Sequence, residues 1–300
     1  MRIQVNHSNH VQQVEIVNEE PQSNWLYRFI RSPLDEIADE QRRYLQSADR
    51  NSARKQAIVV FAVAALMLTM RDEAYRVQIE DLLLWSAANR KVLPSSLISA
   101  VDQLASAKNL QLSRLAIWSL WQFLTYALIP IAVIKFALRG NVREYGLKLN
   151  GVLSGCWIYL VMYLMILPVI LLVSSSASFQ HTYPFFKPDP ISAELPSGYM
   201  PRFWIWQCFY ALQFISLEFF FRGFMLHGMK RQLGAYSIFM MTIPYCMIHF
   251  GKPLPETLGA IIAGVVLGFM SLKTRSIWMG AALHIAVAMT MDFAALYQRL

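Results

Sequence analysis

The sequence predicts an all-α protein, a polytopic transmembrane helix bundle of about seven spans. Three observations support this fold class. Hydrophobic residues make up 56% of the 300 residues. Charged residues make up only 15%, where an average soluble protein has roughly 25%. The apolar residues are also gathered in long runs, and the mean hydropathy of the chain is +0.36.

Each apolar run is a candidate span. A helix that crosses the hydrocarbon core usually needs about 17–25 residues. The first run is shorter than this, although Lys55 and Arg71 at its ends can snorkel toward the interfaces. Whether the first run spans the membrane therefore stays open. The candidate spans are residues 56–70, 115–138, 151–175, 203–227, 235–250, 256–272 and 276–297.

These runs divide the chain into three predicted parts. Residues 1–55 are polar and have no apolar stretch near residue 1, so we expect a cytoplasmic arm without a cleaved signal peptide. Residues 56–138 hold the N-terminal spans and a helical loop outside the cytoplasm. Residues 139–300 hold the remaining spans, which form the core of the predicted bundle.

The basic residues predict the orientation of the bundle. Placing the N-terminus in the cytoplasm also places Arg139, Arg143 and Lys148 there, and leaves the 176–202 loop, which has few basic residues, outside. This distribution follows the positive-inside rule, so we expect an integral protein of a bacterial cytoplasmic (inner) membrane. The net charge of +8 is spread over several turns and forms no single patch, which argues against a nucleic-acid partner.

The last apolar runs contain several ionisable residues, and five of them are the main candidates for a site: Glu218, Arg222, His249, His284 and Asp292. A charged side chain at the centre of a bilayer costs roughly 2.5–3.5 kcal/mol on insertion scales, so such residues normally face the bundle interior and find partners there. Glu218 and Arg222 are four residues apart and share one face of a helix, where they can form an ion pair. His284 and Asp292 are placed to border one cavity.

Two kinds of chemistry fit these residues. A glutamate with a histidine can deprotonate a water, and a second histidine can stabilise an oxyanion. Glu218, His249 and His284 could instead bind zinc, since two histidines and a carboxylate suit that metal. No HExxH sequence fixes two zinc ligands on one helical turn. A purely structural ion pair between Glu218 and Arg222 is the third interpretation.

Two further residues stand near this group. Glu256 begins the run that follows Pro255, where an acidic side chain suits the N-terminal end of a helix and could also cap the cavity. It is therefore a secondary candidate for the site. His227 lies near the end of its span, and we expect it at the membrane interface.

The motifs around these residues resemble the CPBP family of intramembrane proteases, which includes CAAX-processing and bacteriocin-processing (Abi) enzymes. That family carries EExxxR, FxxxH and HxxxN or HxxxD on successive helices. The corresponding sequences here are LEFFFRG at 217–223, YCMIH at 245–249 and HIAVA at 284–288. Tyr-Gly-Leu at 145–147 is also similar to the family, and the resemblance covers about residues 140–297.

The resemblance implies a membrane-embedded endopeptidase, similar to the type II CAAX prenyl endopeptidases, that cleaves a membrane-tethered protein or peptide near its C-terminus. The family's glutamates and first histidine are thought to activate water, and its second histidine to hold the oxyanion; earlier accounts called these enzymes zinc metalloproteases. By position, Glu218 and Arg222 match the second glutamate and the arginine. His249 and His284 match the two histidines.

The sequence departs from the family pattern in three places. Leu217 stands at the first glutamate, Tyr245 replaces phenylalanine, and Ala288 replaces the Asn or Asp after His284. Asp292, one turn further along, could substitute for that residue. Two alternatives to a peptidase therefore stay open. One is a catalytically divergent member of the same fold that acts as a membrane scaffold, an immunity factor or a partner protein. The other is a small proton-coupled transporter.

Overall fold

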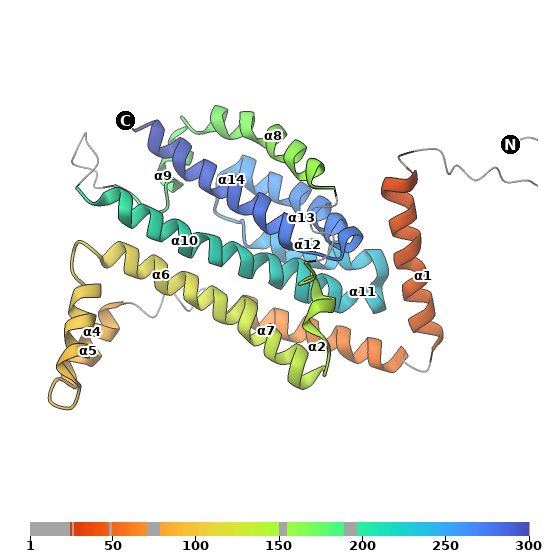
Figure 1. Ribbon diagram of the computed structural model, residues 1–300, viewed down its shortest axis with the longest axis horizontal. Helices are drawn as coiled ribbons and strands as arrows, with labels where there is room; N and C mark the ends of the chain where they lie inside the picture. Colours follow the sequence, from red (N-terminus) through yellow and green to blue (C-terminus); the bar gives the residue numbers. More distant parts are fainter. Residues whose placement is uncertain are drawn as a thin grey trace, which may run out of the picture.

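The computed structural model describes residues 25, 27–47, 50–70, 79–149, 155–188 and 197–299. These residues form helices joined by turns, with no strand among them. Figure 1 shows the long helices lying side by side in the order α8, α14, α10 and α6, with α12 and α13 packed behind them. Helix α1 crosses one end of the bundle against α11, and α4 and α5 project from the opposite end.

Six helical segments of the described chain are long and apolar enough to cross a membrane, which confirms an all-α polytopic bundle. The fourth segment, Tyr199–Met247, contains the predicted span 203–227 and most of the predicted span 235–250, and this accounts for the difference from about seven spans. The first segment has 20 residues, so the run left open by the sequence is long enough to span. The six segments are Arg50–Thr69, Leu110–Ala137, Cys156–Val173, Tyr199–Met247, Leu254–Thr274 and Trp278–Tyr297.

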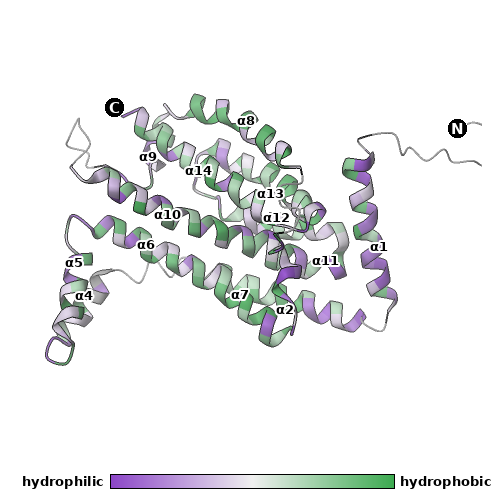
Figure 2. Ribbon diagram, viewed as in Figure 1, coloured by the Kyte–Doolittle hydropathy of each residue, from purple (hydrophilic) through white to green (hydrophobic). Residues whose placement is uncertain are grey.

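The N-terminal helices differ in polarity. Helix α1 begins with Pro33 in its first turn, where proline is tolerated, and it buries only Ile37. Figure 2 shows α1 as largely hydrophilic, unlike apolar helices of the bundle such as α8. Residues 1–24 of the predicted N-terminal arm lie outside the described residues. The elements here are η1 (Tyr27–Arg31), α1 (Ser32–Gln46), α2 (Arg50–Thr69), α4 (Ile79–Ala88) and α5 (Ser95–Leu104).

The middle of the chain contributes the most lipid-exposed helix. Helix α8 has the highest hydropathy of the six candidate spans but only 11% of it is buried, so most of its apolar side chains are exposed. Figure 2 shows α8 as a largely hydrophobic helix at the edge of the bundle. Such a surface requires lipid around it. The elements here are α6 (Leu110–Phe123), η2 (Leu124–Leu128), α7 (Ile129–Ala132), η3 (Val133–Ala137), η4 (Val142–Tyr145), α8 (Cys156–Val173) and α9 (Ala177–Thr182).

The C-terminal helices form the main core. Four phenylalanines of η5 are fully or almost fully buried and pack with residues of α2, α12 and α13, so they belong to the core and do not face lipid. The nine residues of η5 form a π-helix, a widened turn that is rare in proteins and frequent at functional sites. The elements are α10 (Tyr199–Glu218), η5 (Phe219–His227), α11 (Gly228–Leu233), η6 (Gly234–Tyr236), α12 (Ser237–Met247), α13 (Leu254–Thr274) and α14 (Trp278–Tyr297).

The Tyr-Gly-Leu sequence joins the middle of the chain to the start of α14. Gly146 has φ +83°, and a Cβ at this position would lie 2.7 Å from the Ile277 side chain, so only glycine fits. The Gly146 carbonyl accepts a hydrogen bond from the Ile277 amide at 3.0 Å, and Leu147 forms a bridge with Ser276. This contact fixes the end of α14 that leads to His284.

Candidate active site

Glu218 and Arg222 form the buried ion pair that their spacing predicts. Glu218 is the last residue of α10 and Arg222 lies in η5, and both residues have 0% exposure. The distance from Arg222 Nη1 to Glu218 Oε1 is 3.0 Å. The Arg222 guanidinium also lies 3.9 Å from the centre of the Tyr245 ring, a cation–π contact. Two contacts therefore hold this charge inside the bundle.

His284 of α14 meets the same carboxylate. Its Nδ1 atom lies 3.0 Å from Glu218 Oε1. The two side chains differ in access, because 16% of the His284 side chain is exposed but only 1% of the Glu218 side chain. Glu218 Oε2 has no hydrogen-bond partner among the described residues, and a Cβ on Gly280 would lie 3.1 Å from it. The absence of a side chain at Gly280 thus leaves room beside this oxygen.

His249 contacts Tyr245, and Tyr245 in turn contacts Arg222 of the ion pair. Its Nδ1 atom lies 2.8 Å from the Tyr245 carbonyl oxygen, and the two rings are 4.8 Å apart. The Tyr245 ring lies 6.3 Å from the His284 ring. Within the described residues, His249 forms no hydrogen bond with Glu218, Arg222 or His284. Tyr245 stands where the family has phenylalanine, and its ring contacts Arg222 and both histidines.

The turn after α12 positions His249. Gly251 has φ +87°, a conformation that favours glycine, and the chain reverses here before α13 begins at Leu254. The Thr257 hydroxyl donates to the His249 carbonyl at 2.9 Å. This tight turn fixes the backbone of His249.

The comparison with known families bears on this group of residues. Residues 200–290 match the family model described as type II CAAX prenyl endopeptidase Rce1-like. The resemblance to the CAAX protease family is confirmed. The match spans Glu218, Arg222, His249 and His284. No curated protein and no solved structure matches the chain. With its six apolar helices, the chain is an integral membrane protein similar to the CAAX proteases.

At two positions of the CAAX-protease motifs this chain has an apolar residue, and both side chains pack in apolar clusters. Leu217, at the first glutamate, is 5% exposed and belongs to the main apolar cluster. Ala288, at the Asn or Asp position, is 4% exposed and packs among the aromatic rings between α10 and α14. The surroundings of both residues are adapted to apolar side chains, and this reduces the polar groups available around Glu218.

Asp292 does not contact His284 in the structure. Its Oδ1 accepts a hydrogen bond from the Phe185 amide at 3.0 Å. Its Oδ2 accepts from Trp206 Nε1 at 3.2 Å and from Gln207 Nε2 at 2.9 Å. These donors come from α10 and from the segment that precedes it. Asp292 therefore ties that segment to α14, in the end of the bundle that lies beyond Ala288.

Glu256, the secondary candidate, lies in a separate polar contact at the start of α13. Its Oε2 accepts from the Tyr183 hydroxyl at 2.7 Å, and its Oε1 lies 2.6 Å from Lys252 Nζ. Burial, as the largest cause, raises the pKa of Tyr183 well above its ordinary value, so the phenol keeps the proton that it donates. Both carboxylate oxygens of Glu256 are thus occupied by neighbouring residues.

His227 is buried within the protein, and its expected position at the membrane interface stays a prediction. Its exposure is 3%, and its Nε2 lies 3.1 Å from the Ser271 hydroxyl of α13. Ser271 in turn donates to the Arg222 carbonyl at 3.3 Å. Helix α13 and the turn at Gly146 cover the His227 ring.

The donor set does not fit a metal ion in this conformation. In the ranges that the structure describes, no three His, Cys, Asp or Glu side chains are arranged so that they could hold a metal. Structural and catalytic zinc sites use three or four protein ligands. Glu218, His249 and His284 do not form such a set, because His249 meets Tyr245 and not the carboxylate. We therefore derive no step through zinc.

Proposed function

We propose that the chain is an intramembrane endopeptidase of the CAAX-protease type, which hydrolyses a peptide bond in a membrane-tethered protein or peptide. The observation that supports this most strongly is the contact between Glu218 and His284, on two different helices, within the segment that matches the family. Neighbouring titratable groups that are held in fixed geometry are typical of proton-transfer sites.

His284 is the proposed base, since it is the more exposed member of the pair. With its Nδ1 hydrogen donated to Glu218, its Nε2 atom is free to accept a proton from water. The water attacks the peptide carbonyl, and the imidazolium then protonates the departing amine. Glu218 orients the ring and stabilises its charged form, as a buried carboxylate does for the histidine of a catalytic triad.

His249 has a different proposed role. Its Nδ1 proton is donated to the Tyr245 carbonyl, which leaves Nε2 without a proton in the neutral ring. It can therefore stabilise an oxyanion only when it is charged, and burial, as the largest cause, lowers the pKa of His249 to about 3. At neutral pH the uncharged ring supports Tyr245 and does not hold the oxyanion. Arg222 neutralises Glu218 and packs against Tyr245, so it positions both residues. This division differs from the one that the family resemblance implies, where the glutamate is the base and His284 holds the oxyanion.

The experiment uses the full chain reconstituted in liposomes with two membrane-anchored peptides, one prenylated on a C-terminal cysteine and one held by an alkyl chain. Mass spectrometry detects the products. We expect cleavage by the unmodified protein and by His181→Ala, which removes an exposed histidine on α9. His284→Ala should abolish it while the protein stays folded, and Glu218→Gln should abolish it in the fraction of the protein that remains folded. Cleavage by His284→Ala at the unmodified rate would refute the proposal.

A catalytically silent member of the same fold is the second candidate, because Leu217 and Ala288 are packed into apolar clusters. Such a protein would act as a membrane scaffold, an immunity factor or a partner of another membrane protein. Folded, unmodified protein that cleaves neither peptide, and co-purifies with one cellular protein in stoichiometric amount, favours this candidate over the peptidase.

The proposed location is a bacterial inner membrane, with the N-terminus in the cytoplasm. Glu40 of α1 pairs with Lys230 and Arg275, so α1 and two basic turns lie at one end of the bundle. The positive-inside rule assigns this end to the cytoplasm. In a chain without its native cysteines, a membrane-impermeant thiol reagent added to intact cells should label Ser178→Cys but not Asn51→Cys. The reverse labelling would overturn the orientation.

A further inference from the structure

A polar cavity opens at the end of the bundle that α1 crosses, and its lining includes neither Glu218 nor Arg222. Its volume is about 230 Å³, and its charged lining consists of Lys148, Lys230, Arg231, Arg275, Glu40 and Glu144. We call this cavity the basic pocket. A single water needs only about 10–15 Å³ of such volume. The basic pocket is therefore large enough for a polyatomic ligand.

The charges of the basic pocket do not cancel. Its lining has four basic side chains and two carboxylates, which leaves an excess of two positive charges. Burial raises the pKa of Tyr145, which also lines the pocket, to about 12, so its phenol stays neutral and offsets none of this excess. A site with this balance attracts an anion of up to two negative charges.

The ion pairs within the basic pocket leave cationic groups incompletely paired. Glu40 is shared by Lys230 at 3.3 Å and Arg275 at 3.8 Å. Arg231 has a carboxylate of its own, Glu144 at 3.0 Å. Lys148 forms no ion pair within the described ranges. One shared carboxylate and one unpaired ammonium account for the excess charge.

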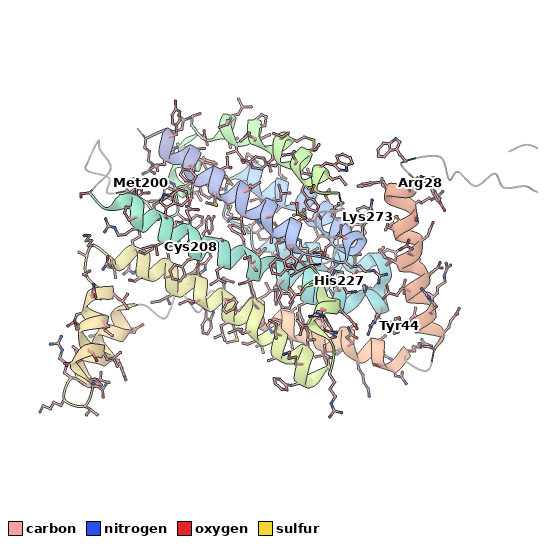
Figure 3. The ribbon with its side chains drawn as sticks, viewed as in Figure 1. Arg28, Tyr44, Met200, Cys208, His227 and Lys273 are labelled. Carbon is pink, nitrogen blue, oxygen red and sulfur yellow. The ribbon has the colours of Figure 1, made fainter. Side chains whose placement is uncertain are left out.

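The surroundings of the basic pocket extend this positive region toward α1. A second cavity of about 270 Å³ shares Glu40, Lys230 and Arg275 with it and adds two basic residues, Arg28 and Lys273, and one acidic residue, Glu36. Figure 3 shows Arg28, Tyr44, His227 and Lys273 at this end of the molecule, with Met200 at the other end of α10. The end of a membrane bundle lies at the level of the lipid headgroups, where basic pockets between helices bind anionic headgroups.

We infer that the basic pocket binds a phosphate-bearing anion, held by Lys148, Arg275 and Arg231. A phosphate monoester carries about −1.5 to −2 charges at pH 7, which matches the excess in the pocket. Guanidinium groups bind phosphate oxygens through two parallel hydrogen bonds, and an ammonium group adds a point charge. The phosphate can belong to the headgroup of an anionic lipid or to a soluble ion, and the two sources are distinguished by experiment.

The test uses the purified full chain in an uncharged detergent. Native mass spectrometry measures the binding of phosphatidic acid, with phosphatidylcholine as the reference lipid, and calorimetry measures the binding of inorganic phosphate. Lys148→Gln removes a pocket charge that no described carboxylate pairs with. Arg143→Gln is the matched control, because Arg143 is an exposed basic residue of the same region that does not line the pocket.

We expect Lys148→Gln to weaken binding about five- to tenfold, as the loss of one charge-assisted contact predicts, and Arg143→Gln to change it less than twofold. Tight binding of phosphatidic acid alone assigns the pocket to a lipid headgroup, whereas binding of inorganic phosphate assigns it to a soluble anion. If neither probe binds, or if both variants weaken binding equally, the inference is overturned.

Discussion

The Nδ1 atom of His284 lies 3.0 Å from Oε1 of Glu218, although 66 positions separate the two residues in the chain. The same oxygen also lies 3.0 Å from Arg222 Nη1. One carboxylate oxygen therefore joins a histidine to an arginine, while the other oxygen faces Gly280. This arrangement predicts how substitutions at and around the carboxylate affect activity and stability.

Glu218→Gln should abolish cleavage and also destabilise the protein. The variant leaves the Arg222 guanidinium buried without its counter-charge, and breaking a buried ion pair from one side costs about 3–5 kcal/mol. Denaturant unfolding in detergent measures this change. In the double variant Glu218→Gln with Arg222→Met, both charges are gone, so most of the stability should return while cleavage does not. Full activity in the double variant would contradict the proposed role of Glu218.

Gly280→Ala should lower the cleavage rate roughly 10- to 100-fold, because a methyl group 3.1 Å from Glu218 Oε2 pushes the carboxylate out of position. Gly259→Ala is the control, since no atom lies within 4 Å of the Cβ that it adds. Both changes favour the helical state by about 1 kcal/mol, so a difference between the two variants reports the contact with Glu218. Equal rates would show that the carboxylate tolerates the methyl group.

Leu217→Glu restores the family's first glutamate, but we expect it to destabilise the fold and not to increase cleavage. The side chain lies in an apolar cluster, where a carboxyl group without a hydrogen-bond partner costs more than about 2 kcal/mol. Leu217→Met, which conserves the volume, should cost less than about 1.5 kcal/mol. Thermal unfolding and the peptide assay check both variants. A stable Leu217→Glu protein with faster cleavage would mean that the site accommodates the second acid.

Asp292→Asn should destabilise the protein by about 1–3 kcal/mol and loosen residues 183–188, because the amide nitrogen cannot accept the hydrogen bonds now made to the carboxylate. Hydrogen exchange followed by mass spectrometry measures that segment. Asp102→Asn is the control, since its pair with Arg90 is exposed and contributes little. We expect cleavage to be largely retained. Loss of cleavage without loss of stability would show that Asp292 acts on His284.

Local rules in the sequence predicted much of the bundle. The lengths of the apolar runs predicted the spans, because a backbone inside lipid must satisfy its own hydrogen bonds and a helix does so within one segment. The spacing of four residues predicted the ion pair between Glu218 and Arg222, because residues four apart share one face of a helix. The order of three short motifs gave the family resemblance, which the match over residues 200–290 confirms.

Other features depended on packing between distant segments. Periodicity placed His284 and Asp292 where both could border a cavity, but two helical turns separate them, and Asp292 meets Trp206 and Gln207 instead. The burial of His227 depends on Ser271 of α13, which no local pattern indicates. Tyr245 could have been noticed from its spacing of four residues before His249, since that spacing puts both rings on one face.

By itself, then, the sequence determined that this chain enters lipid as a set of helices. It also determined which few ionisable residues lie inside those helices. Both follow from helix length, hydropathy and i,i+4 spacing, which are properties of continuous segments. Only the tertiary structure decided that Glu218 meets His284, that Asp292 serves another contact, and that four basic side chains surround one cavity beside α1. Those outcomes depend on how α10, α13 and α14 pack, and packing brings together residues whose separation in the chain gives no sign of their distance in space.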